Sequence, residues 1–383
     1  MKLHALTLGI ATLLASTYSH AIYNLYEKDG LSFDINGEVN LYLESNKADA
    51  KGQAGALSAI YEDLSDERVR LFPERGASWI DFRGSQELGN DWRVTGTVGM
   101  GYSSGNSGAY LNSANISFDK LNVGAISLGR QYLHTGYVTR TGTLTPLDVF
   151  GEQTLRLDYY GTPNLHTSAY YLFPSSTDVR NESSAKTEGF GFSASYNIPL
   201  AGEQNIRLAG GYTNSKANES SVRVPVEKEG LAGSVEYRAG KFLAAGDIGL
   251  LKADMNSSRI AKSEADYWGA KLGYEVSPKF NLVAGYGERK ADTTRQAGVT
   301  SADIISRLTR DATNRGLSAD LRTTFLYDKM TEKRAYVRGD YYVRDNVRVY
   351  GQIQKDEIVG KVDGTDHATY EDTAYRLGVS LTF

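Results

Sequence analysis

The sequence predicts an antiparallel β-barrel that spans a membrane, and three features support this fold class. First, the last nine residues alternate, with Tyr375, Leu377, Val379, Leu381 and Phe383 separated by polar or small residues. Such alternation is typical of a strand with one apolar and one polar face. A strand that closes a barrel leaves no bare edge, and lipid accommodates only helices and closed barrels. Second, the pattern recurs along the chain, and third, short and long connections alternate between the segments.

The first 21 residues predict a secretory signal peptide. Met1-Lys2 carries positive charge, Leu6 to Ala15 is apolar, and Ser19-His20-Ala21 resembles a small-residue cleavage site. The apolar stretch is too short to span a membrane. We therefore expect residues 1–21 to be removed and residues 22–383 to form one barrel domain.

The composition agrees with an all-β chain that is rich in aromatic residues. The chain has 40 glycines, 26 tyrosines, only seven prolines and no cysteine. Its mean hydropathy of −0.40 fits a barrel, because lipid-facing and lumen-facing residues alternate along each strand. No apolar run of 18 residues follows residue 21, so a transmembrane helix is not expected. The absence of cysteine excludes disulfides and thiolate metal sites.

Sixteen segments alternate clearly enough to be predicted as strands. They are Phe33–Leu43, Trp79–Leu88, Arg93–Tyr102, Asn112–Leu121, Val123–Tyr132, Thr154–Tyr160, His166–Phe173, Phe190–Ile198, Ile206–Tyr212, Leu231–Tyr237, Phe242–Leu250, Tyr267–Tyr274, Phe280–Tyr286, Ala335–Arg344, Val347–Ile353 and Ala374–Phe383. Residues 317–332 are ambiguous between a further strand, a hairpin in an outer loop and the start of the next strand. Because single-chain bacterial barrels have even strand numbers, 16 strands are predicted and 18 are the alternative.

The connections between these segments predict which end of the barrel is which. Good turn formers mark short turns at Gly89–Asp91, Leu121-Asn122, Ala239-Gly240, Ser277-Pro278 and Asp345-Asn346. Long polar loops are predicted at 44–76, 133–151, 174–187, 214–229, 252–264, 290–316 and 357–370. Short periplasmic turns and long extracellular loops are typical of outer-membrane barrels. A barrel of this many strands leaves room for a water-filled channel.

Several motifs resemble those of the general porins of Gram-negative outer membranes. They are Tyr26-Glu-Lys-Asp-Gly30, Phe82-Arg-Gly-Ser-Gln-Glu-Leu-Gly89, Gly124-Ala-Ile-Ser-Leu-Gly-Arg-Gln-Tyr132 and the terminal Phe383. The resemblance implies a homotrimer of 16-stranded barrels in contact with outer-membrane lipid and lipopolysaccharide. It also implies that the barrel-assembly machinery reads the strand ending at Phe383, and that the third long loop, at about 133–151, folds into the pore.

The resemblance further implies a pore constriction with acidic and basic sides. Asp148 and Glu152 are the acidic candidates, because Thr143 to Glu152 resembles the acidic loop tip of these porins. The basic candidates Arg83, Arg93, Arg130 and Arg156, and also Arg338 and Arg348, lie on the lumen-facing parity or beside the loop. Positions that are basic in enteric porins carry Glu38, Trp79 and Asn112 here. Three aromatic residues, Tyr42, Trp79 and Tyr336, share the inward face and are candidates for a sugar-binding track.

The predicted function is passive diffusion of small hydrophilic solutes and ions. A substrate-selective porin for sugars or anions is the alternative; an outer-membrane enzyme and a soluble β-sandwich are less favoured. Gly101-Tyr-Ser-Ser-Gly105 matches a nucleophile-elbow pattern but lacks its strand-to-helix turn. The mature chain's histidines, His134, His166 and His367, lie far apart in sequence. We therefore expect no enzymatic activity, cofactor or metal site, and the scattered basic residues argue against nucleic-acid binding.

Overall fold

The computed structural model describes residues 23–71, 78–103, 108–142, 144–174, 186–219, 224–255, 259–317 and 326–383. The predicted signal peptide, residues 1–21, lies outside these ranges. None of the described helices is long and apolar enough to cross a bilayer.

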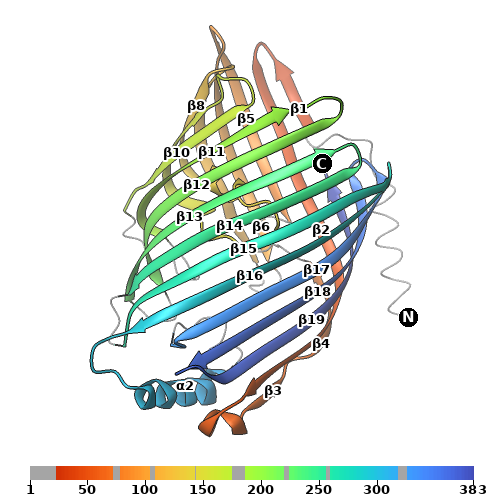
Figure 1. The fold of residues 1–383 in the computed structure, drawn as a ribbon. Helices are drawn as coiled ribbons and strands as arrows, with labels where there is room; N and C mark the ends of the chain where they lie inside the picture. The colour runs from red at the N-terminus through yellow and green to blue at the C-terminus, as the bar shows by residue number, and fades with distance from the viewer. Residues whose placement is uncertain are drawn as a thin grey trace.

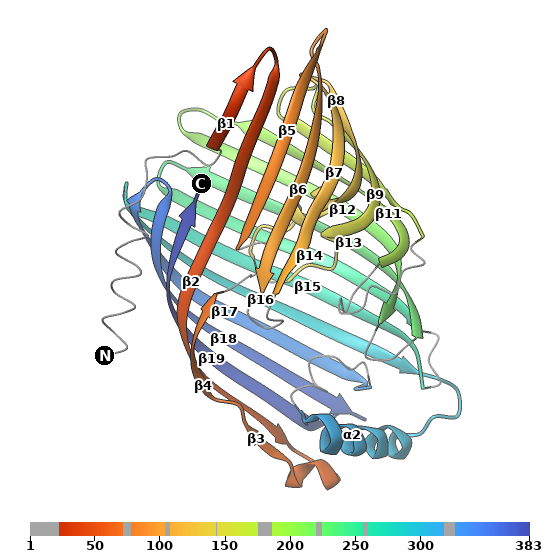
Figure 2. The ribbon, with the colours of Figure 1, turned by 180° about the vertical axis from the view of Figure 1, so that it is seen from behind.

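Sixteen strands form a closed antiparallel ring across the described residues (Figure 1). Each strand pairs with its neighbours along the chain, and β19 pairs back with β2 to close the ring (Figure 2). The strands are β2 (Leu31–Gly52), β5 (Trp79–Gly89), β6 (Trp92–Ser103), β7 (Gly108–Lys120), β8 (Gly124–Tyr132), β9 (Phe150–Tyr159), β10 (Leu165–Leu172), β11 (Lys186–Pro199), β12 (Gln204–Glu219), β13 (Val224–Ala239), β14 (Phe242–Met255), β15 (Ile260–Ser277), β16 (Phe280–Arg295), β17 (Lys329–Arg344), β18 (Val347–Val362) and β19 (Thr365–Thr382). The predicted fold class and the prediction of 16 strands are confirmed.

Three further strands all pair with β2. The strand β1 (Tyr23–Lys28) forms a hairpin with the start of β2, while β3 (Tyr61–Asp63) and β4 (Asp66–Leu71) pair with its later part. Along one edge of β2, β5 pairs with residues 31–38 and β4 with residues 41–46. The pieces β4 and β5 therefore occupy successive stretches of the same edge of β2.

Several predicted outer loops are wrong, because the strands continue through them. Residues 214–229, 252–264 and 357–370 lie largely in strands β12–β15, β18 and β19. In the last of these, Asp363 and Gly364 have φ of 50° and 77° between the paired residues Val362 and Thr365, which is a two-residue hairpin turn. Polar residues above the apolar belt resemble a loop in sequence, yet cross-strand ion pairs such as Lys216–Glu227, at 2.9 Å, link these extensions.

Residues 290–316, also predicted as a loop, contain the α-helix α2 (Ser301–Arg315). The Thr300 side chain accepts from the Asp303 amide, and the Asp303 carboxylate accepts from the Thr300 amide at 2.9 Å. This capping box fixes the start of the helix. Ile304, Leu308 and Ala312 repeat at helical spacing on its buried face. Of the ambiguous segment 317–332, Leu317 follows α2 and β17 begins at Lys329.

The two ends of the barrel differ as predicted. The predicted short turns, such as Gly89–Asp91 and Asp345-Asn346, lie at one end, here called the short-turn end. The other end, here called the long-loop end, carries α2, β3 and the 3-10 helix η1 (Gly55–Ala59), as Figure 1 shows. Between the ends, large apolar side chains point outward. Ile248 is 70% exposed and Leu377 is 58% exposed. Exposed apolar side chains in such numbers fit a surface that faces lipid. Tyr196 and Tyr274 are also exposed, as expected for aromatic residues at the edges of a lipid-facing belt.

We predict that Gly37→Val impairs closure of the barrel. The amide of Gly37 donates to the Phe383 carbonyl at 2.7 Å, and the Phe383 amide returns a bond at 2.9 Å. A Cβ at Gly37 would lie 2.6 Å from the Trp79 carbonyl and 2.8 Å from the Phe383 ring. Such overpacking costs about 1–3 kcal/mol. The folded fraction, measured by the heat-modifiable shift in gel electrophoresis, should fall. Gly96→Val, which meets nothing within 4 Å, is the matched control, and equal folding of both variants would contradict the prediction.

Candidate pore constriction

The segment between β8 and β9, Leu133 to Val149, is the third long loop and is here called L3. It begins with the 3-10 helix η2 (His134–Tyr137) and turns into the barrel interior (Figure 2). Residue 143 lies outside the described part of the chain. Inward-facing residues of β11, β13, β14, β15 and β17 contact L3, as detailed below. The predicted folding of this loop into the pore is confirmed.

Asp247 of β14 is the main anchor of L3. Its carboxylate accepts from the amides of Arg140 and Thr141 at 2.8 and 2.7 Å, and from the Thr141 hydroxyl at 2.6 Å. Asp247 is only 5% exposed, so these bonds form away from bulk water. Hydrogen bonds to a charged group contribute about 1.5–3 kcal/mol each. The tip of L3 is therefore held against the wall.

Two further wall residues bind the same tip by its carbonyl groups. Tyr336 of β17 donates its hydroxyl to the Thr141 carbonyl at 2.7 Å. Lys271 of β15 donates to the Arg140 carbonyl. The sequence prediction placed Tyr336 among lumenal aromatics; its hydroxyl serves here to position L3.

Glycines in the wall allow the return half of L3 to approach the strands closely. A Cβ at Gly230 would lie 2.4 Å from the Pro146 carbonyl oxygen, and one at Gly249 would lie 2.7 Å from Pro146 Cγ. Only residues without a side chain fit at these positions, because the backbone or the ring of Pro146 occupies the space. Next to this contact, Val138 and Leu147 pack on Ala232 of β13.

The predicted acidic residues lie near the root of L3. Asp148 is 8% exposed and lies beside Tyr170 of β10, while its carbonyl accepts from the Thr135 hydroxyl. Glu152 of β9 pairs with Arg130 of β8 at 2.9 Å, and both side chains are largely buried. The structure thus brings two predicted residues of opposite charge together on one wall, rather than on opposite sides of the lumen.

The other predicted arginines occupy different levels of the barrel. Arg156 of β9 binds the Tyr132 carbonyl at 2.6 Å and Asp158 at 2.8 Å, close to the root of L3. Arg83 of β5 lies beside Asp81 on the same strand. Arg93 pairs with Glu87 at 3.3 Å near the β5–β6 turn, with its side chain 55% exposed. Arg93 therefore lies at the short-turn end, away from L3.

A second charged wall lies on β17, β18, β19 and β2, and the sequence predicted only part of it. Here called the wall cluster, it consists of Arg338, Arg348, Arg376, Glu38, Glu44 and Asp340. Its ion pairs join Arg376 to Glu44 at 2.6 Å, Arg338 to Asp340 at 2.8 Å and Arg348 to Glu38 at 3.6 Å. The sequence analysis missed Arg376 and the carboxylates Glu44 and Asp340. Their positions in the alternating pattern place them on the inward face, and the Arg338-x-Asp340 spacing places two opposite charges on the same face of one strand.

Aromatic rings accompany the wall cluster. The guanidinium of Arg338 lies 4.3 Å from the Tyr350 ring centroid, and that of Arg376 lies 5.7 Å from the Tyr42 ring. Such contacts hold guanidinium groups flat against the wall. Tyr42 is therefore buried beneath charge rather than open to the lumen, being 4% exposed. Trp79 of β5 is partly buried opposite Glu38 of β2.

Two histidines that are distant in sequence meet at the start of L3. The rings of His134 and His166 lie 3.9 Å apart, and His134 Nδ1 lies 2.9 Å from the Ser193 hydroxyl. His166 also lies 3.5 Å from Asp158. Ser193 is only 2% exposed, and its hydroxyl contacts the first residue of η2. These two histidines are therefore close in space although they are far apart in sequence, because β10 folds back beside L3.

The turn Asp363–Asp366 at the long-loop end binds cationic side chains of the chain itself. Asp363 pairs with Arg295 at 3.1 Å and Asp366 with Lys361 at 2.9 Å. Within the described ranges, no group of three or more histidine, aspartate or glutamate residues is arranged to hold a metal ion.

A family described as Gram-negative porins matches residues 5–361. The chain belongs to this porin family. It is therefore an outer-membrane channel protein of the Gram-negative cell envelope, as the sequence predicted. No curated protein matches this porin.

Solved structures of other outer-membrane proteins share the fold at low sequence identity. OmpT of Vibrio cholerae, as a loop L8 deletion mutant, is 14% identical with a TM-score of 0.60, over 91% of this chain and all of that one. An anion-selective porin from Comamonas acidovorans is 12% identical with a TM-score of 0.59, over 92% of this chain and 100% of that chain. OmpF of Salmonella typhi, in complex with daunomycin, is 16% identical with a TM-score of 0.54, over 94% of this chain and 100% of that chain.

We predict that Asp247→Asn loosens L3. The substitution keeps the size of the side chain but weakens three bonds to a charged acceptor. L3 should then sample positions away from β14, so open-channel current noise should increase and single-channel conductance should change. Asp254→Asn, an exposed position on the same strand, is the control. Equal noise in both variants would show that Asp247 does not hold L3.

We also predict that acid weakens the root of L3 through His134. Burial, followed by the nearby His166, lowers the pKa of His134 from 6.5 to about 4. Because the undocked loop takes up a proton at higher pH, the stabilisation by neutral His134 is complete above about pH 6.5 and is lost as the pH falls toward 4. Channel noise in planar bilayers should therefore rise between pH 7 and pH 4.5. His134→Gln, which cannot be protonated, should flatten this dependence, whereas His367→Gln should leave it unchanged.

Proposed function

We propose that this porin is a passive diffusion channel for small hydrophilic solutes and ions. The observation that carries the proposal is L3 itself, which is bonded to the wall of a closed 16-stranded ring at Asp247, Tyr336 and Lys271. A loop fixed in this way narrows a lumen while leaving the rest open to water. Charged and polar residues, including the wall cluster, line the inward faces.

We assign the constriction to the candidates near L3 and to the wall cluster. Asp148, Glu152, Arg130 and Arg156 lie at the root of L3, and Arg83 lies on β5. These ion pairs lie along the wall and present local dipoles to water and polar solutes in the passage. Two opposite charges at 4 Å attract each other by about 4 kcal/mol at an effective permittivity near 20. Arginine suits this role because it stays charged at all physiological pH values. Because most of these charges are paired, no solute is held tightly, which favours rapid exit.

A homotrimer is the assembly that we propose. One of the solved structures is a trimer form of OmpT of Vibrio cholerae. The outward apolar belt of this porin is suited to lipid and to neighbouring protomers. We further propose that lipopolysaccharide contacts the long-loop end and that the barrel-assembly machinery reads the strand that ends at Phe383. No enzymatic activity is proposed. Of the nucleophile-elbow pattern, residues 104 and 105 lie outside the described ranges.

A substrate-selective porin is the second candidate, and the wall cluster is the observation that favours it. The guanidinium groups of Arg338 and Arg376, each placed over a buried tyrosine ring, offer hydrogen-bond donors to a sugar hydroxyl or an anion. One of the neighbours is itself an anion-selective porin. Saturable, solute-specific block of the ionic current would favour this candidate over free diffusion.

Planar-bilayer recording tests the proposed function directly. The purified porin should give ohmic current steps in groups of three, with little block by sugars. Properly folded protein that gives no conductance would contradict the proposal that this porin is a channel.

Ion preference should respond to the wall cluster. Arg348→Gln leaves Glu38 and Asp340 with one cation fewer, so cations should be favoured. In water, a unit charge about 10 Å from the ion path changes the energy of a passing monovalent ion by about 0.4 kcal/mol. This corresponds to about a twofold change in the local concentration of each ion. The reversal potential across a potassium chloride gradient should shift toward potassium selectivity. Arg93→Gln, at the short-turn end, is the control, and a larger shift for this variant would exclude the assignment.

A further inference from the structure

The inward faces of the strands change character toward the long-loop end. Near the middle they carry charges such as Arg338 and Arg376, but near the end they carry apolar residues. Inward-facing side chains that are at most 6% exposed there include Ala50, Val226, Met255, Ile260, Ile358 and Ala368. An apolar lining is the opposite of what a water-filled lumen needs. These apolar side chains are therefore expected to be covered by another part of the chain at the long-loop end.

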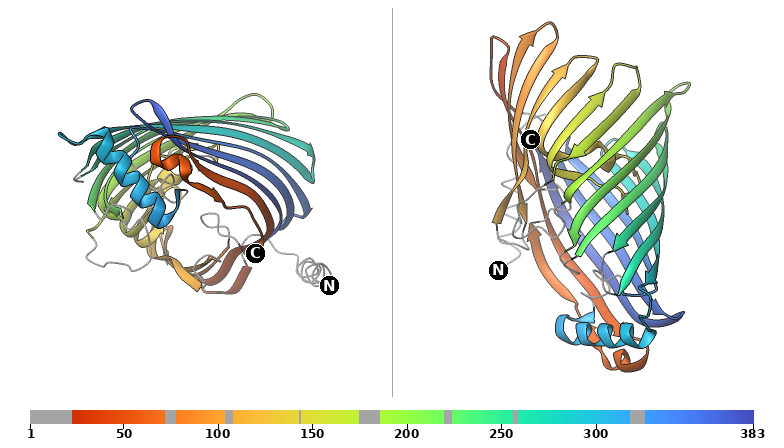
Figure 3. Two further views of the ribbon diagram at one scale, coloured as in Figure 1. Left: turned by 90° about the horizontal axis from the view of Figure 1, so that it is seen from below. Right: turned by 90° about the vertical axis from the view of Figure 1, so that its left-hand side faces the viewer.

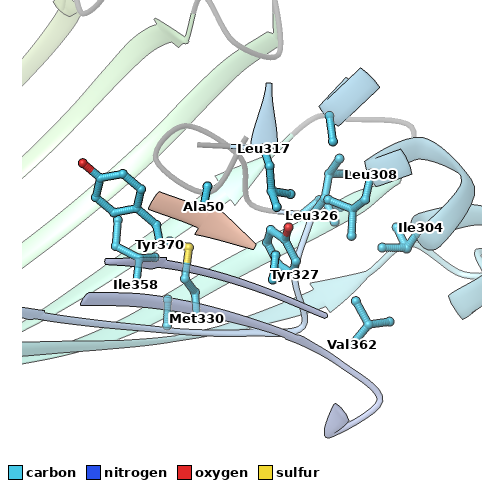
Figure 4. Close-up of a cluster of buried hydrophobic side chains, with 14 of the residues drawn as sticks. Ala50, Ile304, Leu308, Leu317, Leu326, Tyr327, Met330, Ile358, Val362 and Tyr370 are labelled. Carbon is cyan, nitrogen blue, oxygen red and sulfur yellow. The ribbon is translucent and has the colours of Figure 1, made fainter. Parts of the chain in front are cut away.

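The covering element consists of η1, α2, Leu317 and Tyr327, here called the outer cap. Leu57 of η1, Ile304 and Leu308 of α2, and Leu317 are fully buried, and Tyr327 is 1% exposed. These side chains join the apolar ends of the strands in one cluster (Figure 4). Burying a leucine or isoleucine side chain contributes about 1.5–3 kcal/mol. The outer cap is therefore packed as a core is packed, and does not lie loosely over the mouth.

Polar contacts fix the outer cap to the barrel on two sides. The amide of Leu317 donates to the carboxylate of Glu62 in β3. On the other side, Arg295 at the end of β16 donates to Asp328 at 2.7 Å and to the Ser301 hydroxyl at 2.8 Å. The Asp363 amide donates to the same Asp328 carboxylate at 2.7 Å. This bond connects the β18–β19 turn to the same group of contacts. Arg295 thus joins α2 to β16, Asp328 adds the β18–β19 turn, and Leu317 is joined to β3.

The outer cap lies over one side of the mouth. Seen from the long-loop end, α2 and η1 lie across the mouth beside the later strands (Figure 3, left). L3 enters the lumen from β8 and β9, on the other side. Solutes that arrive at the long-loop end, which faces the cell exterior in bacterial barrels, must pass the edge of the outer cap before they reach L3.

We propose that the outer cap is a second size-selecting element, placed in series with L3. This inference rests on the proposed diffusion function. The interior of the outer cap is apolar and closed. The outer cap therefore acts by occupying part of the cross-section of the entrance, and not through charge. The class of solute affected is neutral hydrophilic molecules whose width approaches that of the entrance, such as oligosaccharides, whereas small ions pass with little change.

The experiment compares Leu308→Asp with Ser306→Asp in liposome swelling. A carboxylate at the fully buried position 308 cannot be accommodated without partners, so the helix should leave the cluster. The same charge at the exposed position 306 leaves the cluster intact. Swelling rates are measured for a pentose, a hexose, a disaccharide and a trisaccharide, each relative to the pentose. The relative trisaccharide rate should rise severalfold for Leu308→Asp and stay at the parent value for Ser306→Asp.

A second variant keeps the test decisive if Leu308→Asp does not fold. Residues 301–315 are replaced by a short glycine–serine segment, which removes the apolar face of α2 without placing a charge in the cluster. Folded protein of either variant with the parent's size dependence would overturn the inference. A parent protein that does not conduct at all would instead overturn the proposed function, so the two failures are distinguishable.

Discussion

The pairing of β19 with β2 is the constraint on which the rest of the structure depends. In lipid, every backbone amide and carbonyl must find a partner within the protein, so a sheet is stable only when it closes. The pairing runs from Ala368 opposite Gly52 to Thr382 opposite Glu38, and Phe383 extends it to Gly37. Closure determines which parity faces the lumen on every strand. The charges of the lumen and the apolar belt are both consequences of it.

Within this ring, most charges are satisfied locally. Arg130 meets Glu152, Arg156 meets Asp158, and Arg376 meets Glu44, each between residues of the same strand or of adjacent strands. Pairs of this kind keep the lumen hydrated and polar without a large excess of one sign. Such a lining suits a channel that admits many solutes. Asp247 has a different role, because its carboxylate holds the backbone of L3.

The sequence predicted the strands well, and the contacts across the lumen poorly. Period-two alternation is a local signal, so all 16 strands were found near their observed positions. The outer hairpin at 357–370 was read as a loop, because polar residues beyond the apolar belt resemble loop composition. The helix α2 was missed although the Thr300–Asp303 capping box was readable. The bonds of Asp247 to Arg140 and Thr141 could not be predicted, since they join residues more than 100 positions apart.

The glycines behind Pro146 have a consequence for how such a pore evolves. Gly230 and Gly249 leave room for L3 to sit deep against the strands, and a single methyl group at either position would meet it. An alanine there would displace the loop toward the open passage without altering any charge. The calibre of the channel can therefore be adjusted from behind the loop, independently of its preference for cations or anions.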